Sequence, residues 1–129
     1  MNHNKHRSEE SVEDYLETIL VLSKRISNVR SIDIANELSY SKPSVSVAMK
    51  HLRENQYISI SEEGFITLTP EGRDIAEAVY ERHSLITEWL IHIGVEPSVA
   101  KTDACKMEHD ISPESFDAIK KHILSVLNR

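Results

Sequence analysis

Hydrophobic residues return at helical spacing over most of the first half of the chain. Apolar side chains recur every three or four positions in three segments, which predicts three amphipathic helices. The predicted helices cover residues 10–26, 30–38 and 42–58. Ser11 and Ser41 are suited to be N-caps, and Pro43 falls in the first turn of the third helix, where its missing N–H costs nothing.

Residues 57–69 instead alternate between apolar and polar on both sides of a Glu-Glu-Gly turn. This alternation predicts a hairpin of two short strands with Gly64 in its turn. Helical spacing then returns and predicts three more helices, which begin at Pro70, Pro97 and Pro113. Thr69 and Ser112 are the expected N-caps, and Gly94 ends the first of these three helices.

The order helix, helix, turn, helix, hairpin is the plan of a winged helix-turn-helix. We therefore predict a mainly α fold with two domains. A winged helix-turn-helix DNA-binding domain is predicted over residues 1–69, and an α-helical domain over residues 70–129, whose apolar surplus and potential metal ligands make it the predicted dimerisation and metal-binding domain. Residues 1–8 form a polar tail without an apolar periodicity, and we expect this tail to be disordered.

Composition and charge narrow the classes of protein. No stretch approaches the roughly 20 apolar residues of a membrane span, and the first ten residues lack the apolar core of a signal peptide. We therefore expect a cytoplasmic protein that has no membrane partner. The net charge of −6 argues against nucleic acid, but residues 23–60 hold six basic and three acidic side chains. The one positive segment thus coincides with the predicted helix-turn-helix.

The predicted third helix carries candidate DNA contacts. Its outward positions are small or basic, and its N-terminus offers backbone N–H groups that attract phosphate. The residues predicted to contact double-stranded operator DNA are Ser41, Lys42, Pro43, Ser44, Ser46 and Lys50; Val47 and His51 also point outward. The serines are also explained without DNA, as polar residues on the solvent-facing side of a helix. The hairpin and the local positive charge favour DNA binding.

The second half of the chain holds more apolar residues than its own small core needs. These residues are Leu85, Ile86, Trp89, Leu90, Ile91 and Ile93. The surplus predicts a two-fold homodimer, which would read a palindrome with one recognition helix on each half-site.

Potential metal ligands cluster near the only cysteine. Cys105, Glu108 and His109 stand at positions i, i+3 and i+4, so on a helix their side chains share one face. A single cysteine cannot form an intrachain disulfide, and Cys105 is therefore a reduced core residue, a ligand or a reactive thiol. Asp14 and Glu17 have the same i, i+3 relation on the first predicted helix.

His83, in the fourth predicted helix, is the remaining candidate. The predicted metal ligands are Asp14, Glu17, His83, Cys105, Glu108 and His109. Each residue alone has a structural explanation, as a solvated acid or a histidine at the edge of a core. Together they form a mixed oxygen, nitrogen and sulfur set from three helices. Such a set suits a divalent first-row transition ion better than structural zinc or calcium.

Five segments, EDYLETI, KPSVSVAMKHL, LTPEGR, YERHSLI and DACKMEHDIS, resemble the metal-dependent repressors of the diphtheria toxin repressor and manganese transport regulator family. The similarity covers residues 10–127. It implies a repressor of metal-ion uptake genes that binds palindromic operator DNA as a homodimer when loaded with Mn(II) or Fe(II), with one or two ions per subunit. It places the ligands on the same six residues and DNA contacts on Ser41, Pro43, Ser44 and Ser46.

The chain departs from both branches of this family. The iron branch has methionine where Asp14 stands and cysteine where Cys105 stands, whereas the manganese branch has aspartate at the first position and glutamate at the second, so the ligand set resembles a hybrid. Thr87 and Lys101 stand where an iron-type ancillary site has glutamate and histidine. The chain resembles the short, manganese-type form of the family, and we therefore expect no C-terminal SH3-like domain. Carboxylates favour Mn(II), whereas a thiolate favours Fe(II), Co(II), Ni(II) or Zn(II). The resemblance implies that Cys105 binds through its sulfur or its backbone carbonyl.

Two other classes of protein stay open from the residues. One is a metal-independent winged-helix regulator whose second half is only a dimerisation bundle. The other is a small metalloenzyme, but the sequence has no glycine-rich phosphate loop and no nucleophile paired with a base. We therefore predict that the chain is not an enzyme and has no small-molecule substrate.

Overall fold

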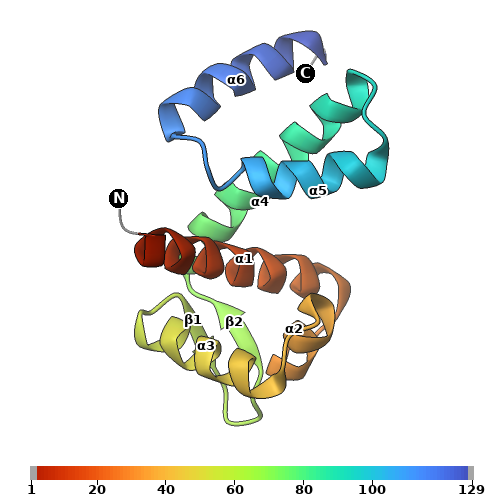
Figure 1. Ribbon diagram of the computed structural model, residues 1–129. Coiled ribbons are helices and arrows are strands. Elements are labelled where there is room, and N and C mark those ends of the chain that lie inside the picture. Colours follow the sequence, from red (N-terminus) through yellow and green to blue (C-terminus); the bar gives the residue numbers. More distant parts are fainter. Residues whose placement is uncertain (1–2, 128–129) are drawn as a thin grey trace. The chain divides into compact units, whose positions relative to one another are not determined.

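The computed structural model shows a mainly helical protein with one small hairpin, as predicted (Figure 1). It describes the backbone of residues 3–127 and the side chains of residues 11–127. In chain order the elements are α1 (His3–Arg25), α2 (Ser31–Leu38), α3 (Lys42–Glu54), β1 (Ile58–Ile60), β2 (Ile66–Leu68), α4 (Pro70–His92), α5 (Pro97–Met107) and α6 (Pro113–Val126). None of the described helices combines the length and hydropathy needed to cross a bilayer.

The chain divides into two compact units, and the division falls between Glu77 and Ala78, inside α4. The start of α4 belongs to the first unit because Ala76 is fully buried in that unit's core. The predicted boundary at residue 69 is where a new helix begins. A periodic pattern locates that start, but it does not indicate which core each turn of the helix joins.

In the first unit, α1, α2, α3, the hairpin and the start of α4 enclose one hydrophobic core. Helix α1 contacts α2 and β2, and α3 contacts α2 and β1. The backbone N–H of Ile66 donates to the carbonyl of Val29 at 2.7 Å, which extends the two-stranded sheet by one bridge. The most buried core side chains of α1, α2 and α3 are Leu16, Ile19, Ile34, Val45 and Met49.

The turn between α2 and α3 is tight. Ser39 ends α2 in the left-handed conformation, with φ 58°, and the Tyr40 N–H donates to the Ala35 carbonyl at 3.1 Å. Ser41 then caps α3, where its hydroxyl accepts a hydrogen bond from the Ser44 N–H. This confirms the predicted turn and cap, which together are the centre of a helix-turn-helix.

The hairpin also follows the prediction. Strands β1 and β2 pair antiparallel, with Ile58 opposite Leu68 and Ile60 opposite Ile66. Gly64 has φ +86° in the turn between them, a conformation that favours glycine.

Two predicted helix boundaries in the first unit are wrong. Helix α1 begins at His3 rather than after Ser11, so the backbone of residues 3–8 is helical where we expected a disordered tail; residues 1 and 2 lie outside the described residues. Polar residues without apolar partners show no periodicity, yet several of them are good helix formers. Helix α3 ends at Glu54 instead of continuing to residue 58, because Gln56, with φ 65°, turns the chain into β1.

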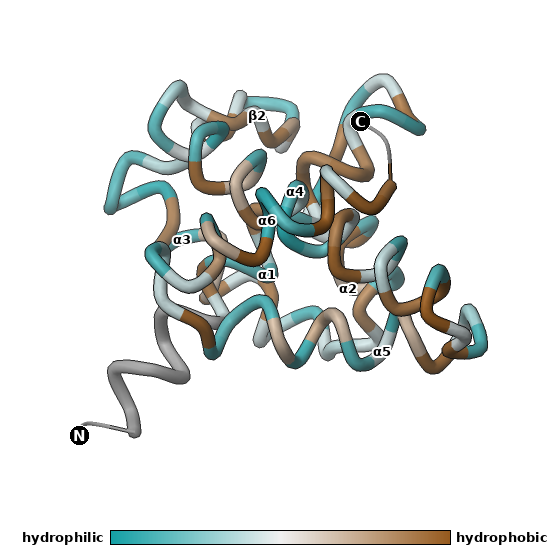
Figure 2. The backbone as a smooth tube through the Cα atoms, turned by 90° about the horizontal axis from the view of Figure 1, so that it is seen from above, coloured by the Kyte–Doolittle hydropathy of each residue, from teal (hydrophilic) through white to brown (hydrophobic). Residues whose placement is uncertain are grey.

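The second unit is built from the remainder of α4 with α5 and α6. Its core contains Leu85, Ile86, Ala104, Phe116 and Ile123. Leu85 and Ile86, which we had assigned to a dimer surface, are therefore core residues of this unit. Ile91 and Ile93 remain exposed. In Figure 2, hydrophobic and hydrophilic residues alternate along the described helices, as expected when each helix buries one face.

Local chemistry explains where the second-unit helices begin and end. Ser112 caps α6 by accepting the Ser115 N–H at 3.1 Å, as predicted, and Gly94 has φ +107° after α4. Glu96 caps α5 and was not predicted. Hydrogen bonds from the Ser98 hydroxyl and backbone N–H hold the pKa of Glu96 below its ordinary value.

Gly72 is expected to be essential for joining α4 to the hairpin. A Cβ atom at this position would lie 2.0 Å from the backbone carbonyl oxygen of Tyr57. Thr69 also donates its N–H to that oxygen, at 3.0 Å, so the carbonyl is held in place. Overpacking of this kind costs about 1 to 3 kcal/mol. We expect Gly72→Ala to lower the free energy of unfolding by about 2 kcal/mol, measured by urea denaturation followed by circular dichroism.

The neighbouring substitution Glu71→Ala is the control, because Glu71 is exposed in the same helical turn. Its expected effect is below about 1 kcal/mol. Equal stability of Gly72→Ala and the unmodified protein would contradict the close approach of α4 to Tyr57.

Candidate metal centre and nucleic-acid interface

A buried carboxylate at the end of α5 lies between two imidazole rings. The side chain of Glu108 is fully buried, its Oε2 lies 3.0 Å from His83 Nδ1, and its Oε1 lies 3.4 Å from His109 Nε2. His83 comes from α4, and His109 comes from the turn after α5. A carboxylate is costly to bury without partners, and here α4 and the turn each supply one. The second unit thus gathers three of the predicted ligands.

Cys105 joins this cluster. Its sulfur, a carboxylate oxygen of Glu108 and a ring nitrogen of His109 lie within 4.8 Å of one another. Helix α5 ends at Met107. Glu108 and His109 therefore lie beyond the helix, whereas the sequence predicts them on it. Glu108 nevertheless keeps helical dihedral angles, and its N–H donates to the Ala104 carbonyl at 3.0 Å. Cys105, Glu108 and His109 therefore keep their i, i+3, i+4 geometry although the helix ends at Met107.

Arg82 holds the turn that carries two of these residues, a role the sequence did not predict. Its guanidinium donates to the backbone carbonyl of Glu108 at 3.1 Å and lies over the Phe116 ring, 5.2 Å from the ring centre. Arg82, which belongs to α4, therefore contacts both α6 and the turn that follows α5. The only signal for it in the sequence is its position next to His83.

The other two predicted ligands belong to the first unit. Asp14 and Glu17 lie one turn apart on α1, and both are partly buried. The Thr18 hydroxyl donates to the backbone carbonyl of Asp14 at 2.8 Å. Their spacing places the two carboxylates on one face of α1.

The chemistry of the second-unit cluster fits a divalent transition metal. It offers one carboxylate, two imidazoles and a thiol, and these are donors that Mn(II), Fe(II), Co(II) and Zn(II) accept in proteins. The ligand atoms of Cys105, Glu108 and His109 are close enough together for one ion to reach all three. By donor type and proximity, this end of α5 is a candidate metal centre.

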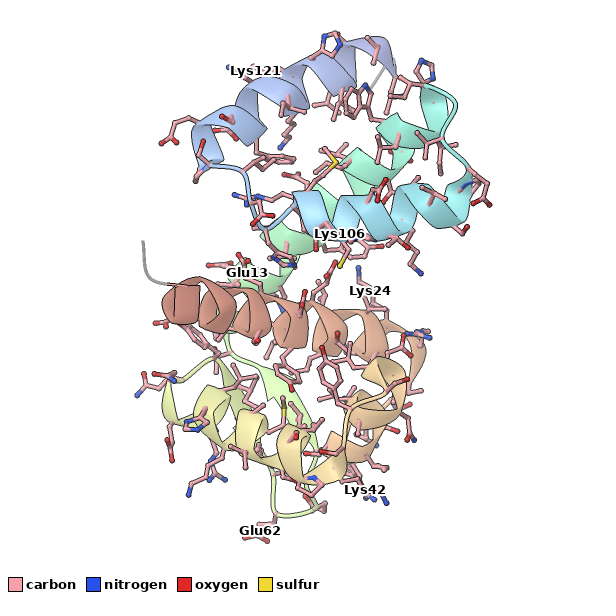
Figure 3. All side chains as sticks on the ribbon, in the orientation of Figure 1. Glu13, Lys24, Lys42, Glu62, Lys106 and Lys121 are labelled. Atoms are coloured by element: carbon pink, nitrogen blue, oxygen red, sulfur yellow. The ribbon has the colours of Figure 1, made fainter. Side chains whose placement is uncertain are left out.

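Helix α3 and its N-cap present the predicted DNA-contacting side chains to solvent. All six, Ser41, Lys42, Pro43, Ser44, Ser46 and Lys50, are exposed. The hydroxyls of Ser41 and Ser44 lie 2.8 Å apart in a hydrogen bond, so these two serines also stabilise the start of the helix. Figure 3 labels Lys42 at this end of α3, with its side chain directed away from the first unit.

The tip of the hairpin has the opposite charge. Glu62 and Glu63 are exposed there, and Figure 3 labels Glu62 at the tip. The backbone N–H of Glu63 and the Ser61 hydroxyl hydrogen-bond to the Glu63 carboxylate and hold its pKa below the ordinary value. Glu63 is thus charged at neutral pH. In the first unit, the exposed lysines and serines of the predicted DNA-contacting set therefore lie on α3 and not at the hairpin tip.

Comparison with known proteins also separates a DNA-binding part of the chain from a metal-binding part. Residues 9–64 match the family model described as "Iron dependent repressor, N-terminal DNA binding domain". Residues 69–126 match the one described as "Iron dependent repressor, metal binding and dimerisation domain". The "Transcriptional regulator MntR" of Salmonella typhimurium is 36% identical over 113 residues, which are 88% of this chain and 71% of the relative. The chain belongs to the diphtheria toxin repressor and manganese transport regulator family.

Other members of this repressor family are similarly close. The "HTH-type transcriptional regulator MntR" of Listeria monocytogenes is 35% identical over 109 residues, 84% of this chain and 77% of that protein. Among solved structures, that of the manganese regulator SloR is 29% identical, with a TM-score of 0.74, and covers 91% of this chain. The chain spans about half the length of that solved chain, namely 53%.

Membership of this repressor family confirms several predictions at a general level. The chain is a metal-dependent transcriptional regulator and not an enzyme. Its two domains imply DNA and a second copy of the chain as partners. The particular metal, the residues that bind it and the genes under its control remain predictions.

Proposed function

We propose that this protein represses metal-ion uptake genes in the cytoplasm by binding palindromic operator DNA as a homodimer when loaded with Mn(II) or Fe(II). One observation carries the proposal: the buried Glu108 carboxylate stands between His83 and His109, beside the Cys105 sulfur. A repressor of uptake genes needs a sensor for the ion whose uptake it controls, and this cluster has the donors of such a sensor.

The proposed ligand set combines this cluster with the two carboxylates of α1. Its members are Asp14, Glu17, His83, Cys105, Glu108 and His109, which provide for one or two ions per subunit. When bound, a divalent cation supplies the positive charge that lets three carboxylates approach one another. Three carboxylates favour Mn(II) and one thiol favours Fe(II), so donor type alone leaves both ions in the proposal.

In this proposal the ligands act by linking the two units. Helix α1 supplies Leu16 and Ile19 to the core of the first unit, so a constraint on α1 also orients α3. His83 and Glu108 belong to the second unit, whose domain type forms dimers. Without metal, the carboxylates of Asp14, Glu17 and Glu108 repel one another and the dimer samples many separations of its α3 helices. With metal, the population shifts to the separation that matches successive major grooves.

The α3 surface would then contact the operator. Lys42 and Lys50 would neutralise phosphates, and the positive end of the α3 dipole would attract one more. The serines Ser41, Ser44 and Ser46, with Pro43, are small enough to let the helix approach base edges. A dimer doubles these contacts, which matters because each subunit offers few positive charges.

The test pairs metal analysis with DNA binding. Protein purified without oxygen is assayed for metal by mass spectrometry, and duplex DNA is selected from a random library in the presence of Mn(II) or Fe(II). We expect a palindromic sequence that binds at least about 100-fold more tightly with one of these ions than with a chelator. Equal affinity under both conditions would instead support a metal-independent winged-helix regulator.

A further inference from the structure

Val47 is an exposed apolar side chain in the middle of α3. It is 57% exposed, whereas its neighbour Val45 is fully buried in the core of the first unit. The buried face of α3 consists of Val45, Met49 and Leu52, so packing does not account for a valine at position 47. Helix propensity does not account for it either, because β-branched residues are weaker helix formers than alanine or lysine.

The position of Val47 connects it to the proposed DNA contacts. On a helix, residues three or four apart lie on one face. Pro43 and Ser44 are one turn before Val47, and Lys50 and His51 are one turn after it. All four are exposed. Val47 therefore stands at the centre of the surface that the proposed function assigns to DNA, with a basic residue and small residues around it.

The chemistry of the major groove limits what a valine can recognise there. Its isopropyl group neither donates nor accepts hydrogen bonds. Among the base edges in the major groove, only thymine presents an apolar group, the C5 methyl; the other bases present donors and acceptors that an apolar contact would desolvate. Resting on the proposed function, we propose that Val47 selects one thymine in each operator half-site by contact with its C5 methyl.

The experiment removes only that methyl group. Duplex DNA selected by the Mn(II)-loaded protein is resynthesised with deoxyuridine in place of each thymine in turn, and binding is measured by fluorescence anisotropy. At one position per half-site we expect about a fourfold loss of affinity, and about fifteenfold when both half-sites are changed, as burial of a single methyl group predicts. Val47→Ala should bind thymine and deoxyuridine equally well at that position.

The matched control is Val99→Ala, the same substitution at another exposed valine, in α5 of the second unit. It should retain the full preference for thymine. The inference is overturned if Val47→Ala keeps the fourfold preference, or if no thymine of the selected DNA is sensitive to loss of its methyl group. If the protein selects no DNA sequence with any metal, the proposed function itself fails, and the inference fails with it.

Discussion

Replacing Glu108 with glutamine is expected to lower the affinity for Mn(II) by about 100-fold or more without unfolding the protein. Glutamine has the shape of glutamate and still hydrogen-bonds with His83 and His109, but its amide oxygen carries no charge. Mutation of a residue that only hydrogen-bonds to a metal ligand lowers metal affinity by about 10- to 100-fold. Removal of a charged ligand should therefore lower the Mn(II) affinity by at least about 100-fold. Isothermal titration calorimetry measures the affinity, and circular dichroism checks the fold.

The DNA affinity of Glu108→Gln should lose its dependence on Mn(II) over the range of concentrations that activates the unmodified protein. Glu81→Gln is the matched control, since it removes one carboxylate from α4 of the same unit. Glu81 is exposed and pairs with Lys120 at 3.0 Å, so it contributes little to stability. If both variants bound Mn(II) like the unmodified protein, Glu108 would not be a ligand.

The sequence was sufficient to predict most of the fold, because local rules determine most of its elements. Ser41, Thr69 and Ser112 cap helices through hydrogen bonds to nearby backbone N–H groups, and Gly64 has the positive φ that its turn requires. Period-two and period-3.6 patterns located the hairpin and all six helices. These features depend on residues a few positions apart, and such residues are visible in the sequence.

Features that depend on distant residues were not predictable in the same way. Leu85 and Ile86 seemed to be surplus apolar residues, but α6 supplies Phe116 and Ile123 to cover them. The contact of Arg82 with the Glu108 carbonyl spans 26 positions, and no spacing rule indicates it. The cluster around Glu108 was partly predictable, because Cys105, Glu108 and His109 are close in the chain. His83 was a candidate only as a further donor on the fourth predicted helix, and no spacing rule connects it to the other three.

The second large effect is expected for Asp14→Ala, which tests whether α1 transmits metal binding to DNA. In the proposed mechanism, Asp14 connects the first unit to ligands of the second. The variant should still bind Mn(II) through His83, Glu108 and His109, with reduced affinity, but the ion should no longer favour one arrangement of the two units. We expect the increase in DNA affinity on adding Mn(II) to fall from about 100-fold to less than about threefold. Anisotropy titrations at saturating Mn(II) and with a chelator give both values.

Reciprocity makes this prediction more stringent. If Mn(II) raises DNA affinity by a given factor, DNA must raise Mn(II) affinity by the same factor. In the unmodified protein, selected DNA should therefore tighten Mn(II) binding by about 100-fold, and in Asp14→Ala it should not. Asp74→Ala, an exposed aspartate in the α4 segment of the first unit, is the control and should keep both factors. Full coupling in Asp14→Ala would mean that the Asp14 carboxylate does not transmit metal binding to DNA, which would leave Glu17 or dimerisation of the second unit to do so.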